Sequence, residues 1–129
     1  MLGVISGINV FVKNYDEAIT FYCDVLGFSL VENTEIMSDF RWVTVKLSEE
    51  SQTQIILAKA QSESQLALVG KQAGNGVLMI ITTHDFDASY QKMKQLGVRF
   101  IEEPRDEPYG KVVIFEDLYG NKFDLIEPL

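Results

Sequence analysis

The chain contains one cysteine, one histidine and one tryptophan in 129 residues. A single cysteine, Cys23, excludes an internal disulfide and any cysteine-rich zinc site, and no histidine follows closely to activate its thiol. The single histidine, His84, has no neighbouring ligand with which to hold a transition metal. We therefore expect it to be solvated or to lie at a helix cap. With no disulfide to form, a reducing cytoplasmic location is the expectation.

Long apolar runs and excess positive charge are also missing. The longest apolar run, VLMII at 77–81, is far too short to cross a bilayer, and the N-terminus lacks the pattern of a signal peptide. Nineteen acidic residues against eleven basic ones give a formal net charge of −8. Because that charge repels phosphate backbones and anionic lipids, we expect no nucleic-acid partner and no membrane partner.

What the chain does contain is an ordinary globular composition, 47% hydrophobic and 23% charged, at a length suited to one domain over 1–129. Within it, two stretches begin alike: GINVFVKNYDEAITFYCDVLGF and GVLMIITTHDFDASYQKMKQLGV. Each reads as a strand, a polar cap at Asn14 or Asp85, and a helix ending at Gly27 or Gly97. These glycines lie 70 positions apart. We infer an internal duplication.

Apolar residues recur at helical spacing in both halves, as at Ala18, Tyr22 and Leu26. After the helices, strands are predicted at 28–32, 40–47, 53–59, 98–102, 111–116 and 121–126. The modules are then 1–60 and 76–129, joined by a linker at 61–75 with a short helix at 65–71. The predicted fold class is α+β: two βαβββ modules forming an eight-stranded, cup-shaped mixed sheet with one main helix per module.

One helix over four strands can cover only one face of a sheet, so the other face is expected to be concave and open. Side chains alternate along a strand, which lets the sequence assign faces. Phe123 and Leu125 take the core side of the last strand and leave Asp124 on the concave side. The same alternation predicts further concave-side residues: Gly7, Asn9, Phe11, Leu78, Ile80 and Thr82.

Two other features leave alternatives open. Trp42 shares a face with Thr44 and Lys46, and either lines the cavity as a stacking platform, which we favour, or lies at a sheet edge. The charged segment 102–110, EEPRDEPYG, is either a solvated loop or a lid over the cavity. As a lid it would offer the Arg105 guanidinium to an anionic group, and it would offer the Tyr109 hydroxyl.

The motifs DEAITFYCDVLGF (16–28) and EDLYGNKFDL (116–125), one in each βαβββ module, resemble the vicinal oxygen chelate superfamily. That superfamily includes glyoxalase I, extradiol dioxygenases, fosfomycin-resistance enzymes and metal-free bleomycin-resistance proteins. The resemblance covers the whole chain, and it implies a homodimer that completes its pockets across subunits.

Metal enzymes of this superfamily use four inward side chains, one from each of four strands, to polarise vicinal oxygens of the substrate. Carried onto this sequence, those positions fall on Gly7, at or beside Ile56, near Leu78, and on Asp124. Only Asp124 can bind a metal, and one carboxylate cannot hold zinc, nickel or iron. The resemblance therefore implies no metal site and no cofactor.

The expectation is a glyoxalase/bleomycin-resistance-like protein that binds a small organic molecule in its concave pocket. An alternative is an enzyme: a lyase or dioxygenase with a displaced metal, or a metal-free isomerase or epimerase. Asp124 would then be its catalytic base, and Arg105 or Asn9 would stabilise oxyanion charge. A third reading is an interaction module without a ligand. The predicted ligand-binding residues are Asn9, Phe11, Trp42, Leu78, Arg105, Tyr109 and Asp124.

Overall fold

A computed structural model describes every residue from 1 to 129 and divides the chain into two compact units, Met1–Val69 and Gly70–Leu129. The first unit contains β1 (Gly7–Val12), α1 (Tyr15–Ile19), the π-helical stretch η1 (Thr20–Val25), β2 (Ser29–Met37), β3 (Phe40–Lys46), β4 (Gln54–Lys59) and α2 (Glu63–Leu68). The second contains β5 (Val77–Thr82), α3 (Phe86–Gln95), β6 (Arg99–Phe100), β7 (Arg105–Glu107), β8 (Gly110–Glu116) and β9 (Lys122–Pro128). The predicted α+β class is confirmed, with a four-stranded and a five-stranded sheet and one strand more than predicted.

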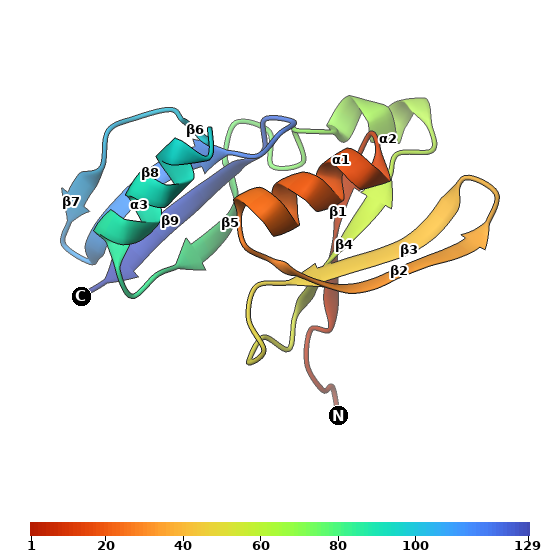
Figure 1. Ribbon diagram of the computed structural model, residues 1–129, viewed down its shortest axis with the longest axis horizontal. Helices are drawn as coiled ribbons and strands as arrows, with labels where there is room; N and C mark the ends of the chain where they lie inside the picture. The colour runs from red at the N-terminus through yellow and green to blue at the C-terminus, as the bar shows by residue number, and fades with distance from the viewer. The chain divides into compact units, whose positions relative to one another are not determined.

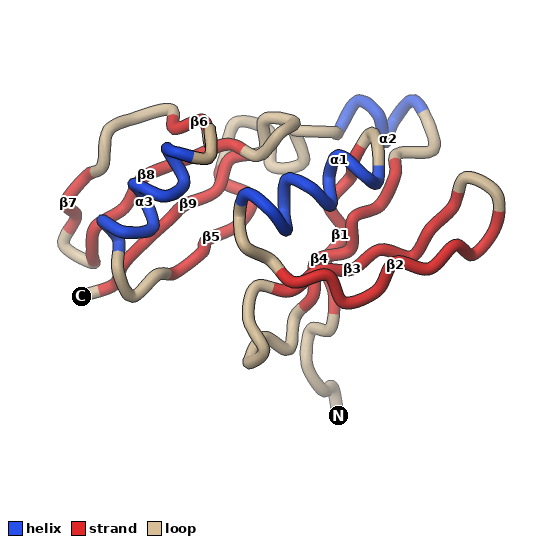
Figure 2. The backbone as a smooth tube through the Cα atoms, viewed as in Figure 1, coloured by secondary structure: helices blue, strands red, loops and turns tan.

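The first sheet has the strand order β1-β4-β3-β2, with β1 parallel to β4 and the remaining pairs antiparallel. In this unit α1 lies against one face of the sheet (Figures 1 and 2). Val10 and Val12 are fully buried, as the predicted alternation requires, whereas Ile8 at the start of β1 remains 44% exposed. The other fully buried strand residues of this core are Val43, Val45 and Leu57.

The predicted caps are present in both units. The side chain of Asn14 accepts a hydrogen bond from the Glu17 N–H at 2.9 Å, and that of Asp85 accepts one from the Ala88 N–H at 3.1 Å. Gly27 and Gly97 end their helices with φ of +84° and +87°, in the left-handed region where glycine has no steric penalty. Sequence spacing thus located both ends of each helix.

The first helix differs from the prediction in its interior. Its α-helical part ends at Ile19, and the chain continues as the π-helical η1, closed by an N–H···O bond from Leu26 to Phe21 at 3.0 Å. Fully buried Tyr22 lies in this stretch and packs edge-on against Phe28, with ring centroids 5.4 Å apart. The short helix predicted at 65–71 is present as α2, and it begins earlier because the Ser62 side chain caps it.

The second sheet has the order β5-β9-β8-β6, and β7 also pairs with β8. The strand predicted at 98–102 is present as the two-residue β6, whereas the prediction of a loop at 102–110 is wrong because this segment contains β7. The chain leaves β8 after Ile101, whose N–H still donates to the Ile114 carbonyl at 3.2 Å, and Pro104, which has no N–H to pair, precedes its return as β7. The segment that was expected to be either a solvated loop or a lid is therefore largely a tight β7–β8 hairpin, with Pro108 and Tyr109 at its turn.

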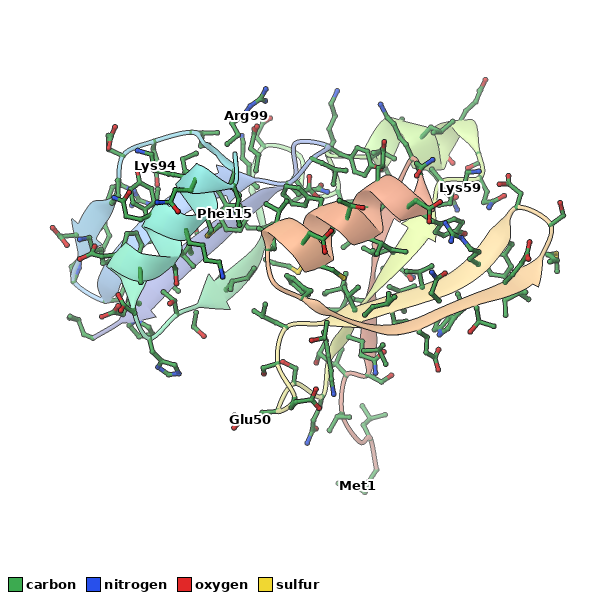
Figure 3. The ribbon with its side chains drawn as sticks, in the orientation of Figure 1. Met1, Glu50, Lys59, Lys94, Arg99 and Phe115 are labelled. Atoms are coloured by element: carbon green, nitrogen blue, oxygen red, sulfur yellow. The ribbon has the colours of Figure 1, made fainter.

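Aromatic rings form the core between α3 and the second sheet. Successive ring centroids lie 5.8 Å apart from Phe86 to Tyr90, 4.7 Å from Tyr90 to Phe100, 6.1 Å from Phe100 to Phe115, and 5.4 Å from Phe115 to Phe123. Such edge-on and stacked pairs stabilise beyond the area they bury. Phe115, labelled in Figure 3, is 1% exposed. Because these rings are buried, one face of β8 and β9 belongs to the core.

A buried carboxylate closes the turn between β8 and β9. Asp117 is 5% exposed, and its side chain accepts hydrogen bonds from the backbone N–H groups of Tyr119 and Asn121, each at 2.9 Å. It also accepts one from the Asn121 side-chain amide at 2.9 Å. Gly120 completes the turn at a φ of +101°. This turn sets the register of β9 and hence the face on which Asp124 lies.

We expect Asp117→Ala to lower the free energy of unfolding by about 2–4 kcal/mol, because it removes these bonds and leaves buried donors unpaired. Urea unfolding followed by circular dichroism measures the change. Asp106→Ala, at an exposed position of β7, is the control and should stay within about 0.5 kcal/mol of the wild type. Equal losses in the two variants would mean that the turn forms without this carboxylate.

Candidate functional site

Asp124 lies in the middle of the open face of the second sheet. It stands opposite Ile80 of the parallel strand β5 and opposite Ile114 of the antiparallel strand β8. Directly paired residues project to the same face, so the carboxylate has an apolar side chain on each side. Ile80 is 67% exposed, and Asp124 is partly buried. A shift in register places Val77 and Leu78 against the single residue Lys122.

The surroundings of Asp124 raise the pKa of its carboxyl group. Partial burial raises the pKa of the carboxyl group above its ordinary value, and the negative charge of Glu102 raises this pKa further. The positive charge of Arg105 acts in the opposite direction. Arg105 is the cation that acts on Asp124, while Lys122, two residues away in β9, donates to the Asn75 carbonyl at 3.4 Å.

Arg105 is held in place by two carboxylates of its own unit. Its Nε donates to Glu102 Oε2 at 3.0 Å, and its Nη1 donates to Glu107 Oε1 at 2.7 Å. These bonds, Glu102 first, raise the pKa of the guanidinium above its ordinary value, and Tyr109 adds a smaller contribution. The fork that we expected to bind an anion is therefore already engaged in the folded unit.

Glu102 is a site residue that the sequence analysis did not single out. The same Oε2 atom that accepts from Arg105 also accepts the backbone N–H of Ile114 at 3.0 Å. It thereby completes the hydrogen bonding of β8 where the neighbouring chain detaches between β6 and β7. The mixed charges of the segment EEPRDE indicated that ion pairs would form there. Strand alternation alone, however, could not show which carboxylate would turn toward Arg105 and β8.

Tyr109 and His84 remain at the surface. Tyr109 is 56% exposed at the turn of the β7–β8 hairpin. His84 is exposed between β5 and α3, in agreement with the solvated position expected for it. Cys23 is partly exposed, and burial followed by the nearby charge of Asp24 raises the pKa of its thiol. None of the helices has the length and apolar character needed to cross a membrane.

The open face of the first sheet carries the other predicted ligand contacts. Asn9 of β1 lies opposite Ile56 of β4, and Phe11 lies opposite Ala58. Thr44 of β3 lies opposite Ile56 from the other side. Trp42 is two residues from Thr44 on the same face, and 39% of its surface is exposed. The structure thus gathers Asn9, Phe11 and Trp42 on one face within the first unit.

The four positions that the superfamily uses for metal do not form a suitable donor set. Gly7 has no side chain, and a Cβ added there would lie 2.9 Å from the Ile56 Cδ1 atom, so Ile56 fills the space a ligand would need. In the second unit Leu78 is apolar, and only Asp124 has a donor atom. No group of three or more histidine, cysteine or carboxylate side chains in the chain is arranged to hold a metal.

A charged cavity of about 330 Å³ lies at the tip of the β2–β3 hairpin in the first unit. Arg41 donates from Nη2 to Asp16 at 2.9 Å, and its guanidinium lies over the Tyr15 ring, 4.7 Å from the centroid. Lys59, labelled in Figure 3, pairs with Asp39 at 2.5 Å. These contacts tie the hairpin to α1 and β4, so both cations of this cavity already have acidic partners.

Two comparisons of sequence bear on the identity of the chain. It is 40% identical over 117 residues to an uncharacterized protein of Shewanella frigidimarina, covering 90% of this chain and 87% of the relative. It is also 27% identical over 119 residues to a probable lactoylglutathione lyase of Synechocystis sp., covering 90% and 88%.

Solved structures show the same architecture. The structure of UcmS2 superimposes with a TM-score of 0.85 at 27% identity, over 98% of this chain and 99% of that one. TnmS3, an antibiotic-binding protein from Streptomyces sp. CB03234, does so with a TM-score of 0.82 at 23% identity, over 99% and 98%, a likeness of fold alone. The family model of the Glyoxalase/Bleomycin resistance protein/Dioxygenase superfamily matches residues 4–125. The chain therefore belongs to that superfamily.

Proposed function

We propose that this protein binds a small organic molecule and does so without a metal. The observation that carries the proposal is the position of Asp124, a partly buried carboxylate between Ile80 and Ile114 on an open sheet face. Arg105, held by Glu102 and Glu107, lies on the same sheet and acts on it electrostatically. Apolar surface around a few fixed polar groups is the usual composition of a ligand site.

The charges around Arg105 bear on the kind of ligand. Three carboxylates, those of Glu102, Glu107 and Asp124, accompany the single guanidinium of Arg105. An anionic ligand would have to displace the two carboxylates that already bind Arg105. A neutral or cationic molecule with hydroxyl or amine donors could instead donate to Asp124. We therefore favour a ligand that presents hydrogen-bond donors to this face.

We propose Asn9, Phe11 and Trp42 as ligand contacts of the first unit, and Leu78 and Tyr109 as further contacts of the second unit. Trp42 supplies an exposed ring on which a planar group can stack. The antibiotic-binding protein TnmS3 illustrates that this fold can serve binding. We also propose a homodimer, supported by the edge strand β2, all nine residues of which are exposed.

An enzyme is the second candidate, because the raised pKa of Asp124 suits a general base and one relative is a probable lactoylglutathione lyase. In a metal-free isomerase or epimerase, Asp124 would remove a proton from the substrate.

A lactoylglutathione lyase assay with and without added Ni²⁺ or Zn²⁺ separates the binding candidate from the enzymatic one. Turnover that Asp124→Asn abolishes would replace the binding proposal with the enzymatic one.

A thermal-shift screen with aromatic amines, aromatic alcohols and dicarbonyl metabolites tests the binding proposal. For hits that carry a donor group, Asp124→Asn should weaken binding by about 5- to 30-fold, because it removes one charge-assisted hydrogen bond while keeping the side-chain size. Isothermal titration calorimetry measures the change. The control Asp87→Asn alters an exposed carboxylate of α3 and should bind like the wild type.

Hits that bind Asp124→Asn as tightly as the wild type would remove Asp124 from the site. A screen with no hits would instead favour the interaction module.

The raised pKa of Asp124 also predicts a stability effect of defined sign. A carboxyl group whose pKa is higher in the folded than in the unfolded state favours folding when protonated, and this contribution is lost as the pH rises through the folded pKa. Asp124→Asn should therefore have a higher melting temperature than the wild type at pH 7. The difference should shrink as the pH falls toward 3.8, the ordinary value for this group. A constant difference across this range, measured by scanning calorimetry, would contradict the assignment.

The donor set predicts weak metal binding. In equilibrium dialysis against Zn²⁺, Ni²⁺ or Mn²⁺, followed by elemental analysis, the protein should retain well under one equivalent, because one carboxylate cannot replace three or more protein ligands. Stoichiometric metal that survives a chelator wash would overturn the metal-independent proposal. Repeating the dialysis on Asp124→Ala then shows whether this carboxylate holds the ion.

A further inference from the structure

Thr44 carries a buried hydroxyl group with no partner. The residue is 2% exposed, and its Oγ1 atom makes no hydrogen bond, the only buried side-chain nitrogen or oxygen of the chain in this condition. The other buried polar side chains, Asp117 and Asn121, bond to one another. Burying an unpaired hydroxyl is unfavourable, so this position calls for an explanation other than packing.

Valine would satisfy the packing at this position without that cost. Thr44 lies between Val43 and Val45, which are both fully buried, and valine has nearly the same shape and an equally strong preference for strands. The neighbouring valines point to the helix-covered face, so alternation places Thr44 on the open face. There it lies opposite Ile56 on one side and Glu32 on the other.

The surroundings of Thr44 are those of a contact site. Ile56 occupies the space beside Gly7 and forms an apolar floor. Trp42, two residues along the same face, is about 7 Å away along the strand, which matches the size of a fused aromatic ring system. Trp42 and Lys46 lie two residues from Thr44 on either side and share its face; Trp42 is 39% exposed and the Lys46 side chain 22%.

We propose that the Thr44 hydroxyl is a specificity-determining ligand contact, which pairs with a hydroxyl or carbonyl group on a planar aromatic molecule stacked against Trp42. This inference rests on the proposed binding function and adds to it the class of ligand and the residue that selects it. Ligand binding gives the orphaned hydroxyl its partner, and an analogue without a polar group leaves it unpaired. Sites of this kind discriminate strongly against such analogues.

The test compares two ligands that differ in one group, 2-naphthol and 2-methylnaphthalene. Trp42 is the only tryptophan, so its indole N–H gives a single NMR signal within the proposed site. Titrations of the wild-type protein followed by this signal should show 2-naphthol binding at least about 5-fold more tightly, the worth of one hydrogen bond. Thr44→Val should bind both compounds equally, and Thr44→Ser, which keeps the hydroxyl, should retain the preference.

The melting temperature provides an independent readout without ligand. Thr44→Val should melt at a higher temperature than the wild type, because it removes an unpaired buried group, while losing the preference for 2-naphthol. A lower melting temperature, with Thr44→Ser unchanged, would mean that the hydroxyl has a structural partner and would overturn the inference. If Thr44→Val keeps the preference, Thr44 is not the selecting residue, and the binding function still stands. If neither compound binds the wild type, the aromatic ligand class is wrong.

Discussion

Each sheet of this protein carries one main helix, and one helix can bury only one sheet face. This constraint divides every strand into residues that pack under α1 or α3 and residues that remain on the open side. In the second unit the buried side is a chain of aromatic rings that includes Phe115 and Phe123. The burial of those rings is what presents Asp124, between Phe123 and Leu125, to the opposite face.

The polar group in the turn before β9 and the polar groups on the open sheet faces differ in their hydrogen bonding and solvation. Asp117, which serves the turn before β9, has its lone pairs occupied by backbone and amide donors. Asp124 and Thr44 both face the open side. Asp124 is partly desolvated, and the Thr44 hydroxyl has no hydrogen-bond partner. Groups kept at a cost to stability commonly serve function, because a ligand can provide what the folded chain does not. The two open faces are therefore the natural places to look for binding.

The chain has the superfamily fold, and the four positions that the resemblance assigns to a metal contain a single carboxylate. Ile56 fills the space beside Gly7, and no donor stands at either position in the first unit. In the second unit Asp124 lies near an arginine that Glu102 and Glu107 neutralise. Asp124, the one carboxylate among the positions carried over from the superfamily's metal enzymes, is proposed here as a hydrogen-bond acceptor for a ligand. The same fold can thus support different chemistry when a few inward side chains change.

The sequence by itself determined the order of elements apart from β7, the caps at Asn14 and Asp85, the helix ends at Gly27 and Gly97, and the face of Asp124. These depend on local periodicity and backbone preferences, which act between residues close in the chain. Only the tertiary structure decided that 102–110 returns as β7, that Glu102 turns inward to hold Arg105 and β8, and that Thr44 has no partner. These features depend on which strands lie side by side and on the pairing of individual polar atoms. Contacts of that kind join residues distant in sequence, and local patterns do not encode them.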